Sequence, residues 1–171
     1  DQPPISRPQV ALEQLHMASF LHTKMPSAAR NLWFRLIHNK VSAKANTAHI
    51  LRLPDDLCIN CGVRETTTHF LFTCPSIEEV WINYFALVFV PTEPLRLGSV
   101  YDNVMALNLS SYRLLDSDLK ITVFEAFTCI LTAIWRAKWL FFFESVDSSN
   151  ESITDRAMIS LRRLSSLNIC N

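Results

Sequence analysis

The sequence predicts a mainly α-helical fold, a single helical bundle that carries a short cysteine-containing insert. Only two glycines occur in 171 residues, too few for the tight turns of a hairpin-rich β fold. Apolar residues make up 49 % of the chain and recur with the spacing of one helix face. A chain of this length and apolar content can bury one sizeable core. We therefore expect residues 10–171 to form one helical domain.

The N-terminal third is expected to hold a linker and two helices. Residues 1–9 contain three prolines and should form an extended linker. A first helix is expected over residues 10–22, and residues 28–51 have the pattern of one long helix. The apolar side of the long helix repeats at i, i+4 and i+8, with Trp33, Ile37 and Val41.

Four more helices are expected in the remainder of the chain. Ser76 and Glu79 have the spacing of a capping box, which predicts that a helix begins at the serine. The segments 116–118 and 148–150 contain residue types that cap helices, so each should precede another helix. The expected ranges are 76–90, 100–109, 119–145 and 153–167.

The expected helix over residues 119–145 is the most apolar part of the chain. No stretch of 18 residues within it is free of charge, so we interpret it as a core helix and expect no membrane partner. The charged residues that interrupt it are Lys120, Glu125, Arg136 and Lys138. Trp135 and Trp139 lie one turn apart and should pack against Trp81 or Phe85.

Three cysteines and one histidine are grouped within 17 residues, in the pattern C-x2-C-x7-H-x4-C. They are Cys58, Cys61, His69 and Cys74. Zn²⁺ prefers four thiolate and imidazole ligands in a tetrahedron, and four protein ligands leave no open position for water. We therefore predict a structural zinc site in a zinc knuckle over residues 56–76. Gly62 directly follows the second cysteine, where a positive φ costs little.

Other interpretations of the metal-binding residue types stay open. The four residues can be a coincidence of core cysteines and a surface histidine, and His49 could replace His69 as the fourth ligand. Cys129 lies in the most apolar segment and should behave as a small hydrophobic residue, while Cys170 lies in the tail. Five cysteines do not suit a disulfide framework, which predicts an intracellular protein, nuclear or cytoplasmic.

Positive charge is concentrated before the zinc motif, although the net charge is zero. Residues 1–52 carry seven Lys/Arg against two Asp/Glu, and residues 53–171 carry nine against fourteen. We predict that four cations of the expected long helix contact nucleic-acid phosphates. They are Arg30, Arg35, Lys40 and Lys44. An ordinary solvated helix face is the alternative. Trp33 could stack on a base, although its apolar neighbours favour core packing.

Motifs for catalysis are weak in this chain. Asp55 and Asp56 have the residue types of a metal-binding pair, but they stand in an expected surface turn. Asp118 and Lys120 form the tail of a nuclease motif that would need an upstream acid such as Asp102 in a sheet. No glycine-rich phosphate loop and no serine–histidine triad signature is present. We predict no catalytic activity and no small-molecule substrate.

Several segments around the zinc motif follow one another in a distinctive order. They are Arg30–Lys40 (RNLWFRLIHNK), Leu57–Gly62 (LCINCG), Glu65–Pro75 (ETTTHFLFTCP) and Val80–Trp81. This order resembles the zinc-binding region of non-LTR retrotransposon reverse transcriptases. Further along, Ala133–Trp139 (AIWRAKW) is similar to a Trp-Arg helix often found near the end of such polyproteins.

The resemblance implies a C-terminal piece of a retroelement protein whose parent is an RNA-directed DNA polymerase. The parent would nick target DNA and copy its RNA from the exposed end. This chain would be a non-catalytic accessory domain that binds template RNA or target DNA beside the rest of the reverse transcriptase. Two alternatives stay open: a structural helical module that docks onto the polymerase or a partner protein, and a nuclease domain.

Overall fold

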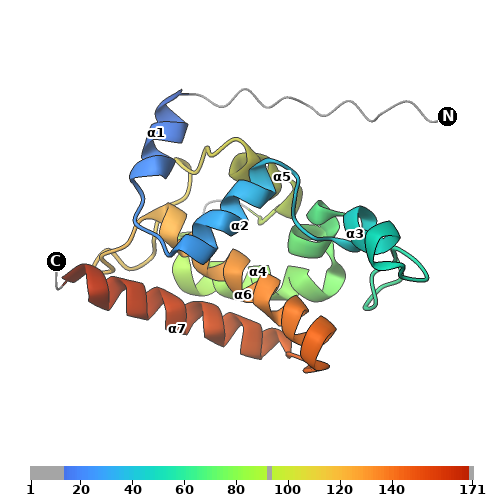
Figure 1. The fold of residues 1–171 in the computed structure, drawn as a ribbon. Coiled ribbons are helices and arrows are strands. Elements are labelled where there is room, and N and C mark those ends of the chain that lie inside the picture. The colour runs from blue at the N-terminus through green and yellow to red at the C-terminus, as the bar shows by residue number, and fades with distance from the viewer. Residues whose placement is uncertain (1–13, 92–93, 170–171) are drawn as a thin grey trace.

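The structure, a computed structural model, describes residues 14–91 and 94–169 and is mainly helical, which confirms the expected fold class. Figure 1 shows the described helices in chain order. They are α1 (Gln14–His22), α2 (Ser27–Ile37), α3 (Lys44–Leu51), the π-helical turn η1 (His69–Thr73), α4 (Pro75–Val88), α5 (Leu97–Met105), α6 (Val123–Glu144) and α7 (Asn150–Ile169). The described residues include no β-strand, only isolated bridges.

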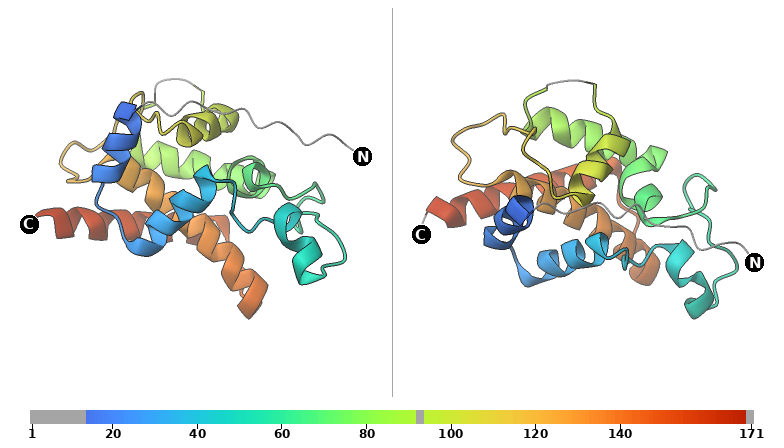
Figure 2. Two further views of the ribbon diagram at one scale, coloured as in Figure 1. Left: turned by 45° about the horizontal axis from the view of Figure 1, so that its top comes forward. Right: turned by 90° about the horizontal axis from the view of Figure 1, so that it is seen from above.

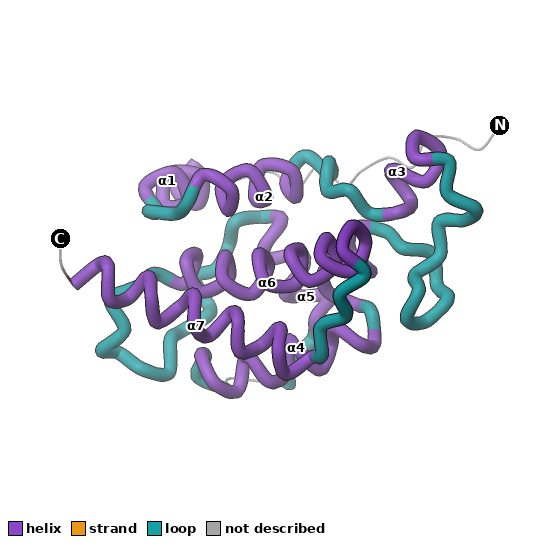
Figure 3. The backbone as a smooth tube through the Cα atoms, turned by 60° about the horizontal axis from the view of Figure 1, so that its bottom comes forward, coloured by secondary structure: helices purple, strands orange, loops and turns teal. Residues whose placement is uncertain are grey.

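Helix α6 lies at the centre of the bundle. It packs against α7 along most of its length and also contacts α4, α2 and η1 (Figure 2). Helices α1, α2 and α3 follow one another along one side of the molecule, across α6 from α7 (Figure 3). The loop between α3 and η1 extends from one end of this row, so the first half of the expected knuckle lies beside the bundle, whereas η1 packs into it.

Aromatic side chains form the centre of the core. Trp81 of α4 is fully buried, stacks on Phe72 at 5.2 Å between ring centroids, and donates its indole N–H to the Leu71 carbonyl at 2.7 Å. The Tyr84 hydroxyl donates to the Ala126 carbonyl at 2.8 Å, which links α4 to α6. Each polar atom of these large side chains is satisfied, so burial of the rings is not offset by a lost hydrogen bond.

Trp33 connects α2 to the same core. Its indole N–H donates to Thr128 Oγ1 of α6 at 2.7 Å, and its ring lies within 6 Å of the rings of Phe20 and Phe124. The side chain is completely buried. Core packing of Trp33, which the apolar stripe favoured, is confirmed.

The expected long helix over residues 28–51 is wrong, because the chain turns between α2 and α3. Asn39 takes a left-handed conformation with φ of 51°, and the Lys40 N–H donates to the Arg35 carbonyl at 2.6 Å. Asparagine tolerates this conformation better than most residues and is a known helix terminator. Val41 is still buried, but from the connecting segment and not from a helix face.

Several expected helix starts shift by a few residues. The capping box that begins α6 is formed by Thr122 and Glu125, whereas Asp116 accepts from the Asp118 N–H in a loop turn. Helix α4 begins at Pro75, so the capping box predicted at Ser76 is wrong. Ser149 does cap α7, where its hydroxyl accepts from the Ser152 N–H at 3.1 Å. Helix α5 begins at Leu97, three residues before its expected start.

The predicted packing of two tryptophans in α6 is also wrong. Trp135 and Trp139 are half-buried and pack on each other at 6.1 Å, and Trp139 stacks on Phe143. Phe127 occupies the expected place beside Trp81, at 6.0 Å. Within the described residues, α6 is the helix long and apolar enough to cross a membrane by length and composition, and 50 % of its most apolar window is buried in the protein.

Candidate metal centre

The four predicted ligands come from three different elements and converge on one point. Cys58 and Cys61 lie in the loop after α3, His69 begins η1, and Cys74 directly precedes α4. Their ligand atoms all lie within 4.8 Å of one another. Cys61 Sγ is 3.2 Å from His69 Nε2, and Cys58 Sγ is 3.8 Å from Cys74 Sγ. A set of three thiolates and one imidazole at these separations can hold a metal ion.

The first pair of ligands is presented by a tight turn. The Cys58 N–H donates to the Val63 carbonyl at 2.7 Å, and the Gly62 N–H donates to the Cys58 carbonyl at 2.8 Å. Gly62 has φ of +72°, as its position after the second cysteine predicted. A residue with a β-carbon would be strained in this conformation. The backbone therefore brings both thiols to the same side of the loop.

The second pair of ligands is spaced by the π-helical turn. The Cys74 N–H donates to the His69 carbonyl at 2.8 Å, which closes the turn between the two ligands. The His69 N–H donates to Thr66 Oγ1 at 3.1 Å. Ser76 lies 3.1 Å from Cys74 Sγ through its hydroxyl and also accepts from the Asn60 side chain. Ser76 thus supports the thiol cluster in place of the predicted capping box.

Burial favours the neutral form of the Cys58 thiol when no cation is bound. Cys58, Cys74 and His69 are 6 %, 2 % and 8 % exposed. Desolvation by burial raises the pKa of the Cys58 thiol from 9.0 to about 11, and the neighbouring Cys74 adds to the increase. A bound divalent cation would reverse this preference, because it stabilises thiolates directly. The four ligands would complete a closed site without an open position for chemistry.

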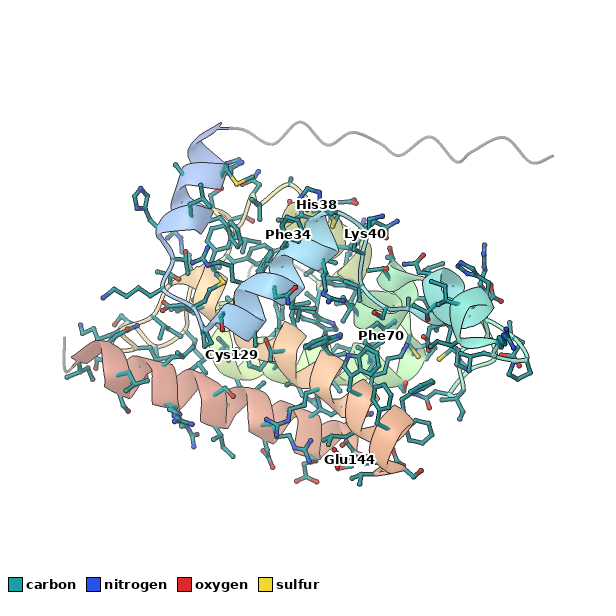
Figure 4. All side chains as sticks on the ribbon, in the orientation of Figure 1. Phe34, His38, Lys40, Phe70, Cys129 and Glu144 are labelled. Atoms are coloured by element: carbon teal, nitrogen blue, oxygen red, sulfur yellow. The ribbon has the colours of Figure 1, made fainter. Side chains whose placement is uncertain are left out.

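A buried ion pair joins the knuckle to the bundle. Lys138 of α6 donates to the Glu65 carboxylate, which also accepts from the Lys44 backbone N–H at 2.9 Å. The Lys138 ammonium lies 4.0 Å from the ring centre of Phe70, a residue labelled in Figure 4. Burial lowers the pKa of Lys138, and Glu65 partly opposes this change. Sequence analysis missed this pair, since 73 residues separate its members.

The four cations predicted to contact nucleic acid do not share one helix. Arg30 donates to the Thr23 carbonyl at 2.7 Å and lies over the Phe20 ring, and Arg35 donates to the Asn31 side chain. Lys40 is exposed in the turn after α2. Lys44 begins α3; it donates to the Leu57 carbonyl at 2.7 Å and lies 3.8 Å from Asp55.

The other candidate residues lie apart from the metal site. His49 is exposed on α3 and outside the ligand cluster, so it does not replace His69. Asp56 pairs with Arg64 at 2.7 Å at the surface. Cys129 is buried in α6, as expected for a small hydrophobic residue, and burial raises its pKa to about 12. Cys170 lies outside the described residues.

Comparisons with known proteins identify no relative. No protein-family model matches the chain, and no curated protein or solved structure matches it significantly.

Proposed function

We propose that this chain is a zinc-stabilised accessory domain of a non-LTR retrotransposon reverse transcriptase, and that it binds template RNA or target DNA without catalysing a reaction. The proposal rests on the resemblance of the segment Arg30–Trp81 to the zinc-binding region of these enzymes, and on the cluster of possible metal ligands within the same segment. Zinc is the ion we assign, because three thiolates and one imidazole suit it better than calcium, magnesium or manganese.

The absence of acidic residues from the segment that forms α1, α2 and α3 carries the nucleic-acid part of the proposal. Residues 14–54, which include α1, α2 and α3, contain six Lys/Arg and no Asp or Glu. These helices lie in a row along one side of the bundle (Figure 3). A surface without carboxylates does not repel phosphates, so even a modest number of cations can give it a positive potential.

The structural-module alternative is favoured by the contacts of two of the cations. Arg30 and Lys44 both donate to backbone carbonyls, and Lys44 also lies near Asp55. Their side chains therefore help to fix the fold whether or not a nucleic acid binds. Arg35 and the exposed Lys40 are then the better residues for a test, because neither holds a backbone carbonyl in the described structure.

The proposal is tested by titrating the zinc-loaded protein with RNA, single-stranded DNA and duplex DNA at several salt concentrations. We expect the logarithm of the affinity to fall linearly with the logarithm of salt concentration, with a slope of roughly −2 to −4. The double variant Arg35→Glu/Lys40→Glu should bind all sequences more weakly and show a shallower slope. Its zinc content and melting temperature should stay those of the parent protein.

A matched control separates this surface from total charge. Arg162 and Arg163 are exposed on α7, so Arg162→Glu/Arg163→Glu changes the net charge equally at a distant place. If both double variants lose affinity equally, the surface formed by α1, α2 and α3 has no special role in binding. If the Arg35/Lys40 variant keeps full affinity, these two residues do not form the binding surface. If the parent protein binds none of the three nucleic acids, the nucleic-acid proposal is wrong and the structural module is favoured.

A further inference from the structure

A cavity of about 260 Å³ lies between the knuckle and the corner where α6 leads into α7. Ile59 and the metal ligand Cys58 contribute to its knuckle wall, and Ala137, Phe141 and Phe142 of α6 contribute to the opposite wall. An apolar cavity of roughly 150 Å³ accepts a benzene ring. This cavity therefore has room for a large aromatic or branched side chain.

Three of the four charged side chains that line the cavity already have partners, and the fourth, Asp147, is exposed to solvent. Lys138 is paired with Glu65, and Lys44 donates to the Leu57 carbonyl. An occupant with its own charge would disturb these pairs or remain unpaired, so the interior favours an uncharged apolar group. Ser148 also lines the cavity, and its buried hydroxyl has no hydrogen-bond partner in the described part of the chain.

Large apolar side chains surround the mouth of the cavity and point into solvent. Ile59 is 64 % exposed, and Phe141 and Phe142 are each more than a third exposed. Phe143, next in the chain, is 70 % exposed. Apolar side chains exposed together beside a pocket are the usual mark of a protein interface, where a central anchor is surrounded by further apolar contacts.

The rim of the same corner is acidic. Five exposed carboxylates stand at the adjoining ends of three helices: Glu78, Glu79, Glu144, Asp147 and Glu151. The Glu79 carboxylate accepts from the Asn150 side chain at 2.6 Å, which holds the start of α4 beside the start of α7. None of the five forms an ion pair within the described residues. Arg136 lies about two turns from Glu144 along α6, and Arg156 lies about one and a half turns from Glu151 along α7.

We propose that this acidic corner is the docking site for a basic amphipathic segment of a protein partner. The segment inserts one large apolar side chain into the cavity and places Lys or Arg side chains over the five carboxylates. Charge complementarity decides the occupant, because the acidic rim repels nucleic acid, and a small neutral molecule in the cavity would leave the five carboxylates without partners. Lys44, Leu53 and Pro54 also line the cavity, but the inference rests on the cavity and the five carboxylates and not on the nucleic-acid proposal.

The test uses the zinc-loaded chain and a fluorescein-labelled amphipathic peptide with one Trp and several Leu on its apolar face and Lys on the other. We expect saturable binding with one peptide per chain in fluorescence anisotropy. A peptide with Glu in place of Lys, and a peptide with Ser in place of Trp, should each bind at least about tenfold more weakly. Ala137→Phe fills the cavity and should weaken binding to a similar extent.

Matched variants separate the cavity from the charge. Zinc content and melting temperature show whether Ala137→Phe folds. If it does not, Phe142→Ser, which changes the exposed mouth of the cavity, replaces it as the test and should also weaken binding. Glu144→Lys/Asp147→Lys should also reduce affinity about tenfold. The controls, Ala28→Phe on the exposed side of α2 and Asp102→Lys/Asp118→Lys on a distant surface, should leave affinity unchanged. The inference is overturned if no peptide binds, or if binding responds to charge everywhere and not to the cavity variants.

Discussion

The knuckle and the bundle differ in what holds them together. The bundle buries Trp33, Trp81 and Phe127 completely, and hydrogen bonds satisfy the polar atoms of both indole rings. The two halves of the knuckle differ: its loop exposes large apolar side chains such as Ile59 and Val63 and buries the Cys58 thiol, whereas η1 buries Phe70, Leu71 and Phe72 in the core. Hydrophobic burial therefore stabilises the bundle and η1, whereas the loop half of the knuckle buries few apolar groups and would gain most from a bound metal.

Loss of one metal ligand should have the largest effect and should act on the knuckle. Cys61→Ser removes one of four ligands, and metal binding to such modules is worth on the order of 10 kcal/mol. We expect loss of stoichiometric zinc and a lowered melting temperature, measured by metal analysis and circular dichroism. Cys129→Ala is the matched control and should retain zinc. A Cys61→Ser protein with full zinc content and unchanged melting would show that the cluster is no metal site.

Truncation of tryptophans should distinguish the bundle core from its edge. Trp81→Ala should lower the free energy of unfolding by about 3–5 kcal/mol, because it leaves a cavity among packed rings. Trp135→Ala should cost about 1 kcal/mol, since its ring is only half-buried, at the edge of the core and beside Trp139. Urea denaturation of the zinc-loaded proteins measures both values. Equal losses would mean that the end of α6 is packed as tightly as its centre.

The Glu65–Lys138 pair tests the junction between the two regions. Each single variant, Glu65→Gln or Lys138→Met, leaves the other charge buried and should cost about 3 kcal/mol. The double variant should recover much of this loss, because no unpaired charge remains. The measurement is a double-mutant cycle of unfolding free energies. Additive losses would mean that the two side chains do not depend on each other.

The sequence predicted the knuckle better than it predicted the helix boundaries. Spacing alone identified Cys58, Cys61, His69 and Cys74, because short loops between ligands leave the chain few ways to place them. The long helix over residues 28–51 failed, since periodicity does not register a single left-handed residue such as Asn39. The apolar pattern continues through Val41, but this residue is buried in the core from the segment between α2 and α3.

Long-range partners were beyond the reach of sequence patterns. Trp135 was expected in the core because it is large and lies on an apolar helix, but the buried residues of α6 lie between Phe124 and Ile134, with Ala137, and periodicity does not show where along a helix burial ends. The position beside Trp81 went to Phe127. Likewise, Lys138 gave no sign that it pairs with Glu65, because any charged residue on a core helix can reach solvent along its stem.

Cysteine ionisation offers the smallest and most selective contrast between the two regions. Burial among apolar groups raises the pKa of Cys129 from 9.0 to about 12, so its thiol stays neutral in the folded protein. Above pH 9 the unfolded chain releases this proton and the folded chain keeps it. The contribution of Cys129 to stability is therefore complete below pH 9 and is lost as the pH rises toward 12, by up to about 1.4 kcal/mol per pH unit.

Cys129→Ala should remove this slope from unfolding free energies measured across that range. In the knuckle a bound metal would hold Cys58 as a thiolate at neutral pH, so the same residue type would carry opposite protonation states in the two regions. A Cys129→Ala protein with the parent's alkaline slope would show that the burial of this thiol does not control its ionisation.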